Sequence, residues 1–157
     1  MNYKRLENFG IYKNKKRTYE ELSYLIAFVY NITTHKLEAV LRQNKISLAN
    51  FNILMILKYK GKDTGMSQTD ITNSLIVSDG NITRVLDRMQ KEKLVIRTSH
   101  PTDRRANLIR ITLKGSDLLE KLWTTYDNII KSTLGTITEK EQKSLIATFH
   151  KIIKPLI

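Results

Sequence analysis

The sequence predicts a mainly α-helical fold with one small β-hairpin, and three observations support this. Apolar residues recur at helical spacing through most of the 157-residue chain. Beyond Lys93 the spacing changes from 3.6 to 2 in two short runs, residues 94–97 and 108–112, which is typical of paired strands. Capping residues and glycines separate the helical segments. The expected order is four helices, the hairpin and two more helices, in a single domain covering residues 1–157.

The first helix is expected from residue 18 to about residue 44. Thr18, with Glu21 three residues later, has the form of a capping box, and apolar residues follow it at helical spacing. Residues 1–17, which precede it, are polar and basic. An arm that contacts phosphate and a solvated tail fit this segment equally well.

Three shorter helices are expected next. Ser47 can cap the first of them, Ser67 can cap the second, and the third is expected to begin at Ser78 and end near Lys91. A tight turn, residues 75–77, separates the last two. The loop after the first of the three is bracketed by two glycines, Gly61 and Gly65.

The hairpin and the last two helices complete the chain. The two expected strands flank a polar loop, residues 99–106. Thr112 can cap a long helix that Gly135 ends, and Thr138 with Glu141 forms a second capping box in front of the final amphipathic helix.

The charge of the chain points to a polyanionic partner. Lys and Arg number 27 against 15 for Asp and Glu, so the formal net charge is +12. Nucleic acid is the first candidate, an anionic membrane surface is the second, and a basic chain that is merely soluble is the third. The absence of cysteine excludes disulfides, thiol sensing and cysteine-ligated zinc. Neither a signal peptide nor a membrane span is evident, so a soluble cytoplasmic protein is expected.

The segment 78–91 carries the pattern that best suits DNA recognition. Its apolar residues form one stripe, Ile82, Val85, Leu86 and Met89. Arg84 and Arg88 lie on the opposite face with Asp87, and Asn81 and Thr83 flank it. Arginine can bond bidentately to guanine and asparagine to adenine. For the segment alone, a solvated helix face is the slightly better explanation, but the preceding short helix and turn make a helix-turn-helix.

The loop of the hairpin carries two adjacent cations, Arg104 and Arg105. Arginines that reach into a minor groove respond to its width and negative potential. Asp103 would be repelled by phosphate, so we expect it to orient a neighbouring arginine. Such a pair on an isolated loop is usually only solvated, but here it follows a candidate recognition helix directly.

Over about residues 20–155 the chain resembles the MarR (multiple-antibiotic-resistance regulator) family of winged-helix proteins. The stretches that carry the resemblance are Met66–Ile71, Val77–Met89, Leu94–Arg97, Asp103–Ala106 and Ile111–Gly115. The resemblance implies an obligate homodimer, with residues 18–44 and 113–157 as dimerisation helices and 47–112 as the DNA-binding lobe. It implies DNA contacts at Ser67, Gln68, Ser78, Asn81, Thr83, Arg84, Arg88, Arg104 and Arg105, and an arginine-bracing role for Asp103. One departure is Lys93, which stands where the family usually has glycine.

The resulting expectation is a sequence-specific transcription regulator, a ligand-responsive repressor that acts as a homodimer on a pseudo-palindromic operator in double-stranded DNA. The alternatives are a non-specific architectural DNA-binding protein and a dimeric interaction protein that has lost DNA binding. No catalytic arrangement, metal site or cofactor is expected, because the three histidines are far apart in the sequence. Family members often sense small aromatic effectors. Aromatic residues at helical spacing are more often core than ligand cage, so no pocket is assigned to Tyr24, Phe28, Tyr30, Trp123 and Tyr126.

Overall fold

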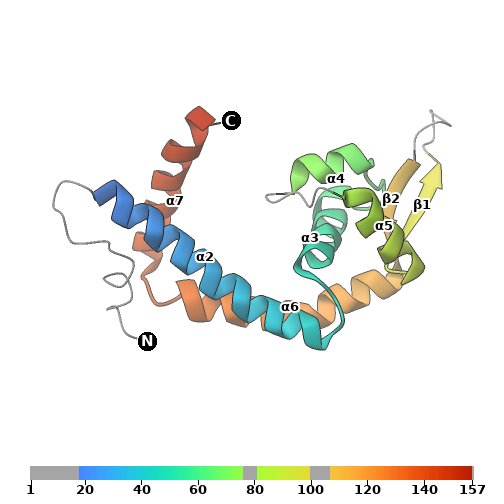
Figure 1. Ribbon diagram of the computed structural model, residues 1–157, viewed down its shortest axis with the longest axis horizontal. Coiled ribbons are helices and arrows are strands. Elements are labelled where there is room, and N and C mark those ends of the chain that lie inside the picture. The colour runs from blue at the N-terminus through green and yellow to red at the C-terminus, as the bar shows by residue number, and fades with distance from the viewer. Residues whose placement is uncertain (1–17, 76–80, 100–106, 157) are drawn as a thin grey trace. The chain divides into compact units, whose positions relative to one another are not determined.

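The computed structural model describes residues 18–75, 81–99 and 107–156 (Figure 1). Within these ranges four α-helices precede the hairpin and two follow it, as predicted. The chain divides into two compact units, residues 37–128 and residues 1–36 with 129–157. The elements are α2 (Thr18–Gln43), α3 (Leu48–Ile56) continued by a π-helical turn η1 (Leu57–Gly61), α4 (Gln68–Ser74), α5 (Ile82–Lys91), β1 (Val95–Ser99), β2 (Asn107–Ile111), α6 (Leu113–Leu134), α7 (Glu139–Ile153) and a short 3₁₀ turn (Lys154–Leu156).

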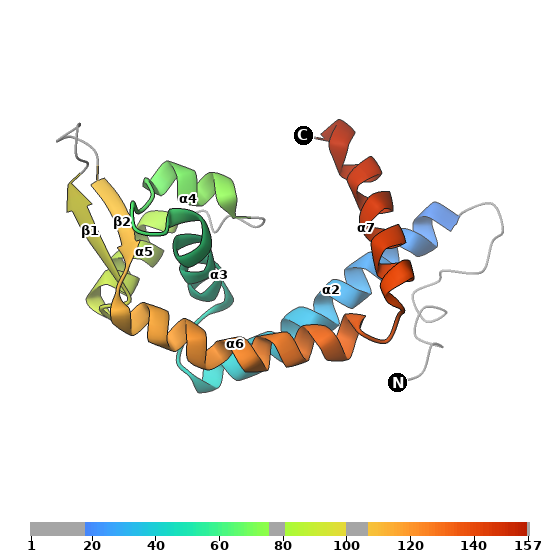
Figure 2. The same ribbon diagram turned by 180° about the vertical axis from the view of Figure 1, so that it is seen from behind.

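The 37–128 unit is built around one apolar core. Both ribbon views show α3, α4 and α5 lying together beside the hairpin (Figures 1 and 2). Each of these elements, and the first part of α6, supplies side chains that water does not reach. The most deeply buried are Phe51, Ile53, Leu54 and Leu57 from α3 and η1, Ile71 from α4, Leu86 and Met89 from α5, Ile109 from β2 and Leu119 from α6.

The hairpin is antiparallel, and the limits of its two strands differ slightly from the predicted ones. Val95 pairs with Ile111, and Ser99 pairs with Asn107. Leu94, predicted as the first strand residue, instead donates its N–H to the Met89 carbonyl at 2.9 Å and closes the end of α5. Thr112, predicted as the last, has left the strand, because its hydroxyl accepts the N–H of Gly115 and so begins α6.

Helix caps confirm several of the predicted boundaries. The side chains of Ser47, Ser67 and Thr138 each accept a backbone N–H from the first turn of the following helix. At Thr138 the capping box is complete, since the Glu141 side chain also accepts the N–H of Thr138. Local sequence therefore fixes where α3, α4 and α7 begin.

One predicted cap and one predicted helix start are wrong. The first helix already includes Thr18, which was expected to be its cap. The helix predicted to begin at Ser78 begins at Ile82, because Asn81 has non-helical backbone angles (φ −139°, ψ 54°) and its side chain accepts the N–H of Arg84. Asparagine is among the best N-cap residues, so it stops the helix from extending backward.

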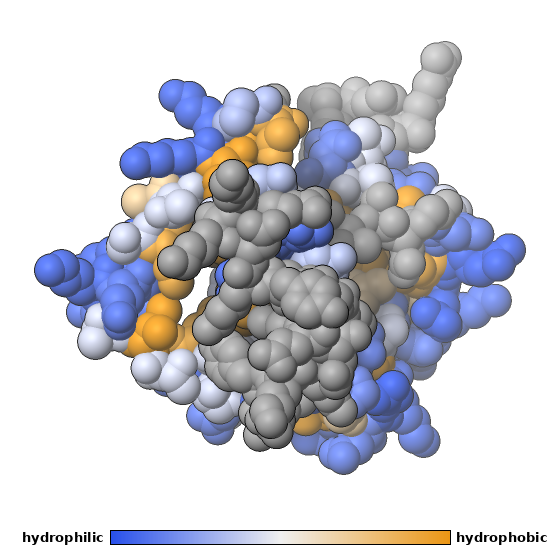
Figure 3. Space-filling view, turned by 60° about the vertical axis from the view of Figure 1, so that its left-hand side comes forward, coloured by the Kyte–Doolittle hydropathy of each residue, from blue (hydrophilic) through white to orange (hydrophobic). Residues whose placement is uncertain are grey.

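The other unit exposes its apolar side chains. No residue of α7 is buried. Figure 3 shows a face of the molecule on which apolar side chains lie at the surface beside strongly hydrophilic ones. The large exposed apolar residues of α7 are Leu145, Ile146, Phe149, Ile152 and Ile153, and those of α2 include Leu22, Ile26 and Val29. Within the described part of the chain, none of the helices is both long and apolar enough to cross a membrane.

Candidate nucleic-acid interface

Helix α5 has two chemically distinct faces. Of the predicted apolar stripe, Val85, Leu86 and Met89 are buried in the core and Ile82 is half-buried. Arg84 and Arg88 are exposed. The buried stripe holds the helix in place and leaves cationic side chains directed away from the core. A helix held in this way can be inserted into a groove without disturbing the core.

The remaining predicted contact residues fall into two groups. Ser67 and Gln68 lie at the start of α4, and Asn81 and Thr83 lie at the start of α5. The structure therefore brings the beginnings of these two helices and the exposed face of α5 into one unit. Four further predicted residues lie outside the described residues: Ser78, Asp103, Arg104 and Arg105.

Two of these side chains are already engaged in capping. The Asn81 Oδ1 atom accepts the N–H of Arg84 at 3.2 Å, so the helix cap uses one of the two lone pairs of this oxygen. The Ser67 hydroxyl accepts the N–H of Asp70 at 3.1 Å and donates to the Asp70 carboxylate at 2.6 Å. Both residues set the orientation of their helices.

Helices α4 and α5 are joined by a hydrogen bond between two predicted contact residues. The Gln68 Nε2 atom donates to the Thr83 hydroxyl at 2.8 Å. The bond lies at an exposed position, where its net contribution to stability is small. Its main consequence is to hold the two side chains at a fixed distance from each other.

Sequence reasoning missed an ion pair between the hairpin and α5. The guanidinium of Arg97 on β1 lies 2.7 Å from the Asp87 carboxylate and donates to the Gln90 carboxamide oxygen at 2.9 Å. Strand periodicity places Arg97 on the same side of the hairpin as the buried Val95. That periodicity was readable from the sequence, but the distance between the strand and the helix was not.

The turn from α5 into β1 uses an unusual backbone conformation. Lys93 has φ +59°, in the left-handed region that favours glycine. Lysine therefore occupies a backbone conformation suited to glycine, at the position where the sequence differs from the family's usual glycine. Three hydrogen bonds support the turn: Lys93 donates its N–H to the Gln90 carbonyl, the Thr112 hydroxyl donates to the Lys93 carbonyl, and Lys114 donates to the Glu92 carbonyl.

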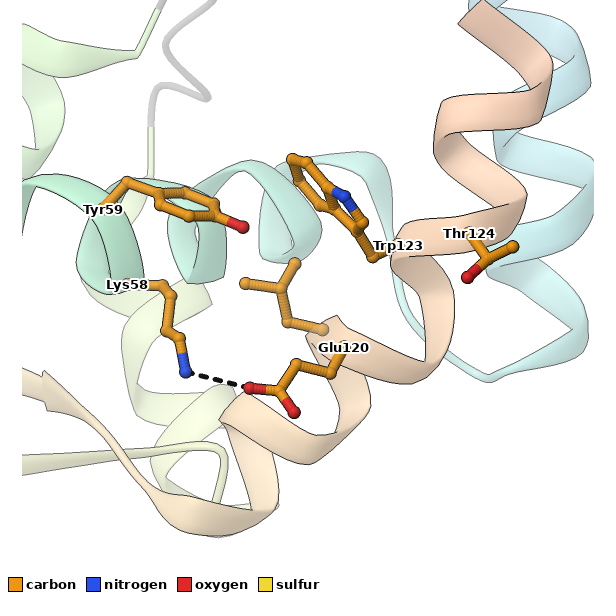
Figure 4. A pocket seen from close by; sticks show the side chains of 6 residues that line it. Lys58, Tyr59, Glu120, Trp123 and Thr124 are labelled. Atoms are coloured by element: carbon orange, nitrogen blue, oxygen red, sulfur yellow. Dashed lines mark hydrogen bonds and ion pairs between the residues drawn. The ribbon is translucent and has the colours of Figure 1, made fainter.

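A small cavity lies between η1 and α6 within the same unit (Figure 4). Lys58 and Tyr59 come from η1, and Trp123 and Thr124 come from α6. Its volume is about 180 Å³. The Tyr59 and Trp123 ring centroids are 5.5 Å apart, so the two rings together form one part of the wall.

An ion pair closes one side of this cavity. Lys58 lies 3.0 Å from the Glu120 carboxylate and donates to the Ser116 hydroxyl at 2.6 Å. The hydrogen bond from Lys58, and then its positive charge, lower the pKa of Glu120 below its ordinary value. In the described ranges no group of three His, Asp or Glu side chains could hold a metal ion.

Comparisons with known proteins agree with this geometry. A sequence model of the MarR family matches residues 46–106. The HTH-type transcriptional regulator MhqR of Bacillus subtilis is 26% identical over 121 residues, which cover 77% of this chain and 81% of that protein. This relative is a transcriptional regulator, which agrees with the expectation of a regulator rather than an enzyme.

Solved structures agree on the fold. The S. aureus MepR–DNA complex superposes with a TM-score of 0.75 at 22% identity, over 85% of this chain and 96% of that one. CouR from Rhodococcus jostii RHA1, bound to p-coumaroyl-CoA, superposes with a TM-score of 0.73 at 19% identity, over 83% and 90%. Residues 46–106 are therefore similar to the MarR family, and the chain has the fold of MepR and CouR.

Proposed function

We propose that this protein is a sequence-specific regulator of transcription that binds double-stranded DNA as a homodimer. The observation that carries the proposal is the exposed, arginine-bearing face of α5, anchored by a buried stripe and lying next to a hairpin. The net charge of +12 attracts a polyanion of any sequence. Selectivity between sequences requires side chains that reach base edges, and α5 presents two of the best suited.

In this proposal α5 lies in the major groove. Arg84 and Arg88 are the candidates for guanine contacts, because a guanidinium can donate to O6 and N7 together. Thr83 and Gln68, joined to each other, suit contacts at the edge of the groove. Arg104 and Arg105 are proposed to reach the adjacent minor groove, with Asp103 orienting one of them; Ser78 is proposed as a backbone contact.

The second copy of the chain is proposed to cover the apolar residues of α2 and α7. The stripe on α7 is centred on Phe149 and stays in contact with water in a single chain. Contiguous apolar surface of this kind marks an interaction site, and most such assemblies are two-fold symmetric. A two-fold dimer places two copies of α5 on half-sites about 34–36 Å apart, which predicts a pseudo-palindromic operator.

A small aromatic effector is proposed for the cavity of Figure 4. CouR is bound to p-coumaroyl-CoA. The support in this chain is the aromatic pair Tyr59 and Trp123 beside the cationic Lys58. Occupation of the cavity would change the packing of η1 on α6 and so bias the placement of the DNA-binding lobe. Repression, by occlusion of a promoter, is the proposed sign of regulation.

The decisive experiment is selection of duplexes from a random library by the purified full-length protein. We expect enrichment of a pseudo-palindrome, bound at least about 10³-fold more tightly than random DNA at moderate salt. Binding to all duplexes without enrichment would indicate an architectural protein instead. No binding of any duplex at low salt would indicate a dimeric interaction protein that has lost DNA binding.

Arg84→Ala tests the role of α5 within that experiment. The variant should lose roughly 1–3 kcal/mol of affinity for the selected operator and much less for random DNA. Lys140→Ala, which removes one charge from α7, is the matched control and should leave the preference unchanged. An equal loss on operator and random DNA would place Arg84 on a phosphate instead of a base.

A further inference from the structure

Arg97 uses both ends of its guanidinium on α5. One terminal nitrogen lies 2.7 Å from Asp87 Oδ1, and the other donates to Gln90 Oε1 at 2.9 Å. The two acceptors are three residues apart and so lie on adjacent turns of one face of the helix. A planar guanidinium bonded at two points fixes the orientation of the strand relative to the helix as well as the distance between them.

We propose that Arg97, Asp87 and Gln90 form a clamp that fixes the hairpin against α5 and thereby sets DNA selectivity. This inference rests on the proposed function. Arg97 is in this view a positioning residue, because both terminal nitrogens of its guanidinium contact α5. The two elements proposed to read DNA, α5 and the hairpin, then meet the duplex as one rigid piece. A rigid pair accepts only sequences that suit both elements at one spacing.

The charge of Asp87 gives the clamp a second effect. Asp87 shares the exposed side of α5 with Arg84 and Arg88, and about half of its side chain is in contact with water (49%). An uncompensated carboxylate at this position would repel the phosphates that the arginines attract. Arg97 compensates it from the strand.

Stability alone is a poor reason for this arrangement. Ion pairs at exposed positions contribute little to folding because water and salt screen them. Of the Arg97 side chain 29% is exposed, and of the Asp87 side chain 49% is exposed, so water reaches the pair. The expected consequence of the clamp is therefore selectivity and hairpin order, with folding stability nearly unchanged.

The test is a double-mutant cycle that removes the charges singly and together. Arg97→Gln leaves Asp87 unpaired and should weaken operator binding by roughly tenfold. Asp87→Asn removes the carboxylate that repels phosphate and should tighten binding to random DNA by a few-fold. The preference for the operator then falls because random DNA is bound more tightly. The double variant has the net charge of the natural chain but lacks the ion pair. Its operator preference should stay about fivefold below that of the natural chain.

Lys143→Gln is the matched charge control. Lys143 forms an exposed ion pair with Glu139 on α7, and its removal changes the net charge as Arg97→Gln does. We expect no change in operator preference. Full recovery of that preference in the double variant would show that Arg97 only neutralises Asp87 and would overturn the clamp. An unaltered preference in all variants would do the same.

Hydrogen exchange without DNA separates failure of the clamp from failure of the proposed function. Backbone amides of β1 and β2 should exchange several-fold faster in Arg97→Gln and in the double variant than in the natural chain. Unchanged exchange rates overturn the clamp whatever the protein binds. Faster exchange in a protein that selects no duplex would overturn the proposed function and, with it, the selectivity assigned to Arg97.

Discussion

The two units of this chain differ in where they keep their apolar side chains. In the 37–128 unit, Phe51, Leu86 and Ile109 are at most 2% exposed. In the described part of the other unit, residues 18–36 and 129–156, no side chain is buried. Phe149, Ile146 and their neighbours on α7 remain 38–56% exposed. Similar residue types therefore form a closed core in one unit and an open surface in the other.

This difference separates two ways of being stable. The 37–128 unit buries its apolar surface within one chain and so presents α5 on a rigid support. The other unit has amphipathic helices whose apolar stripes need a further surface to cover them. A second copy supplies that surface under the proposed function. Helix α5 would then be held in place by one chain alone. The distance between the two copies of α5 on DNA would depend on the dimer.

The largest expected effect is on the closed core. Leu86→Ala should lower the free energy of unfolding of the lobe by about 2–5 kcal/mol, because it leaves a cavity under α5. Urea unfolding, followed by circular dichroism, measures it. Leu145→Ala makes the same chemical change on α7, where the side chain is 46% exposed. Similar losses for the two variants, independent of protein concentration, would abolish the contrast between the units.

The next effect concerns the open surface. Phe149→Asp places a charge at the centre of the α7 stripe and should weaken dimer association by roughly a hundredfold. Sedimentation equilibrium over a range of concentrations measures this. Ala147→Asp introduces the same charge on the opposite face of the helix and is the control. A monomeric natural chain, or equal weakening by both variants, would contradict the role given to the stripe.

Most of the fold was predictable because short-range signals determine it. Ser47, Ser67 and Thr138 each mark a helix start by accepting an N–H a few residues away, and the change of period after Lys93 marks the hairpin. The start of α5 was misplaced because two neighbours, Ser78 and Asn81, are both good caps. Their propensities are similar, and only the folded backbone decides between them.

The candidate site was predictable only in part. The exposed face of α5 follows from helical periodicity, so the exposure of Arg84 and Arg88 could be predicted. The contacts of Arg97 with Asp87 and of Gln68 with Thr83 join separate elements, and their distances depend on tertiary packing. Asn81 was predicted as a DNA contact, and the structure shows in addition that its oxygen caps α5. Whether such a side chain caps a helix depends on the local backbone geometry of the folded chain.

A smaller effect is expected at the turn that connects α5 to the hairpin. Lys93→Gly relieves a left-handed backbone and should raise the free energy of unfolding by about 0.5–1 kcal/mol. Thermal unfolding of the natural chain and the variant measures it. Lys93→Ala removes the same charge but keeps the Cβ atom, so it should give no gain. Equal gains in both variants would assign the effect to charge instead of backbone conformation.

The smallest effect compares one carboxylate from each unit. The pKa of Glu120 is lowered by Lys58, and the pKa of Glu141 is lowered by hydrogen bonds from the Thr138 hydroxyl and backbone N–H. A lowered pKa in the folded state means that the stabilisation is complete above the ordinary carboxyl pKa. It is lost as the pH falls through the lowered value.

Glu120→Gln should therefore melt below the natural chain at about pH 6, and the difference should shrink toward zero at about pH 3. Glu141→Gln should show the same trend, but in the helicity of α7 and not in the unfolding of the lobe, because Glu141 only caps its own helix. Thermal scans and circular dichroism across that range distinguish them. A gap that widens on acidification would contradict the sign of both shifts. Identical responses of the two variants would mean that the two units unfold together. The units would then differ in side-chain exposure but not in stability.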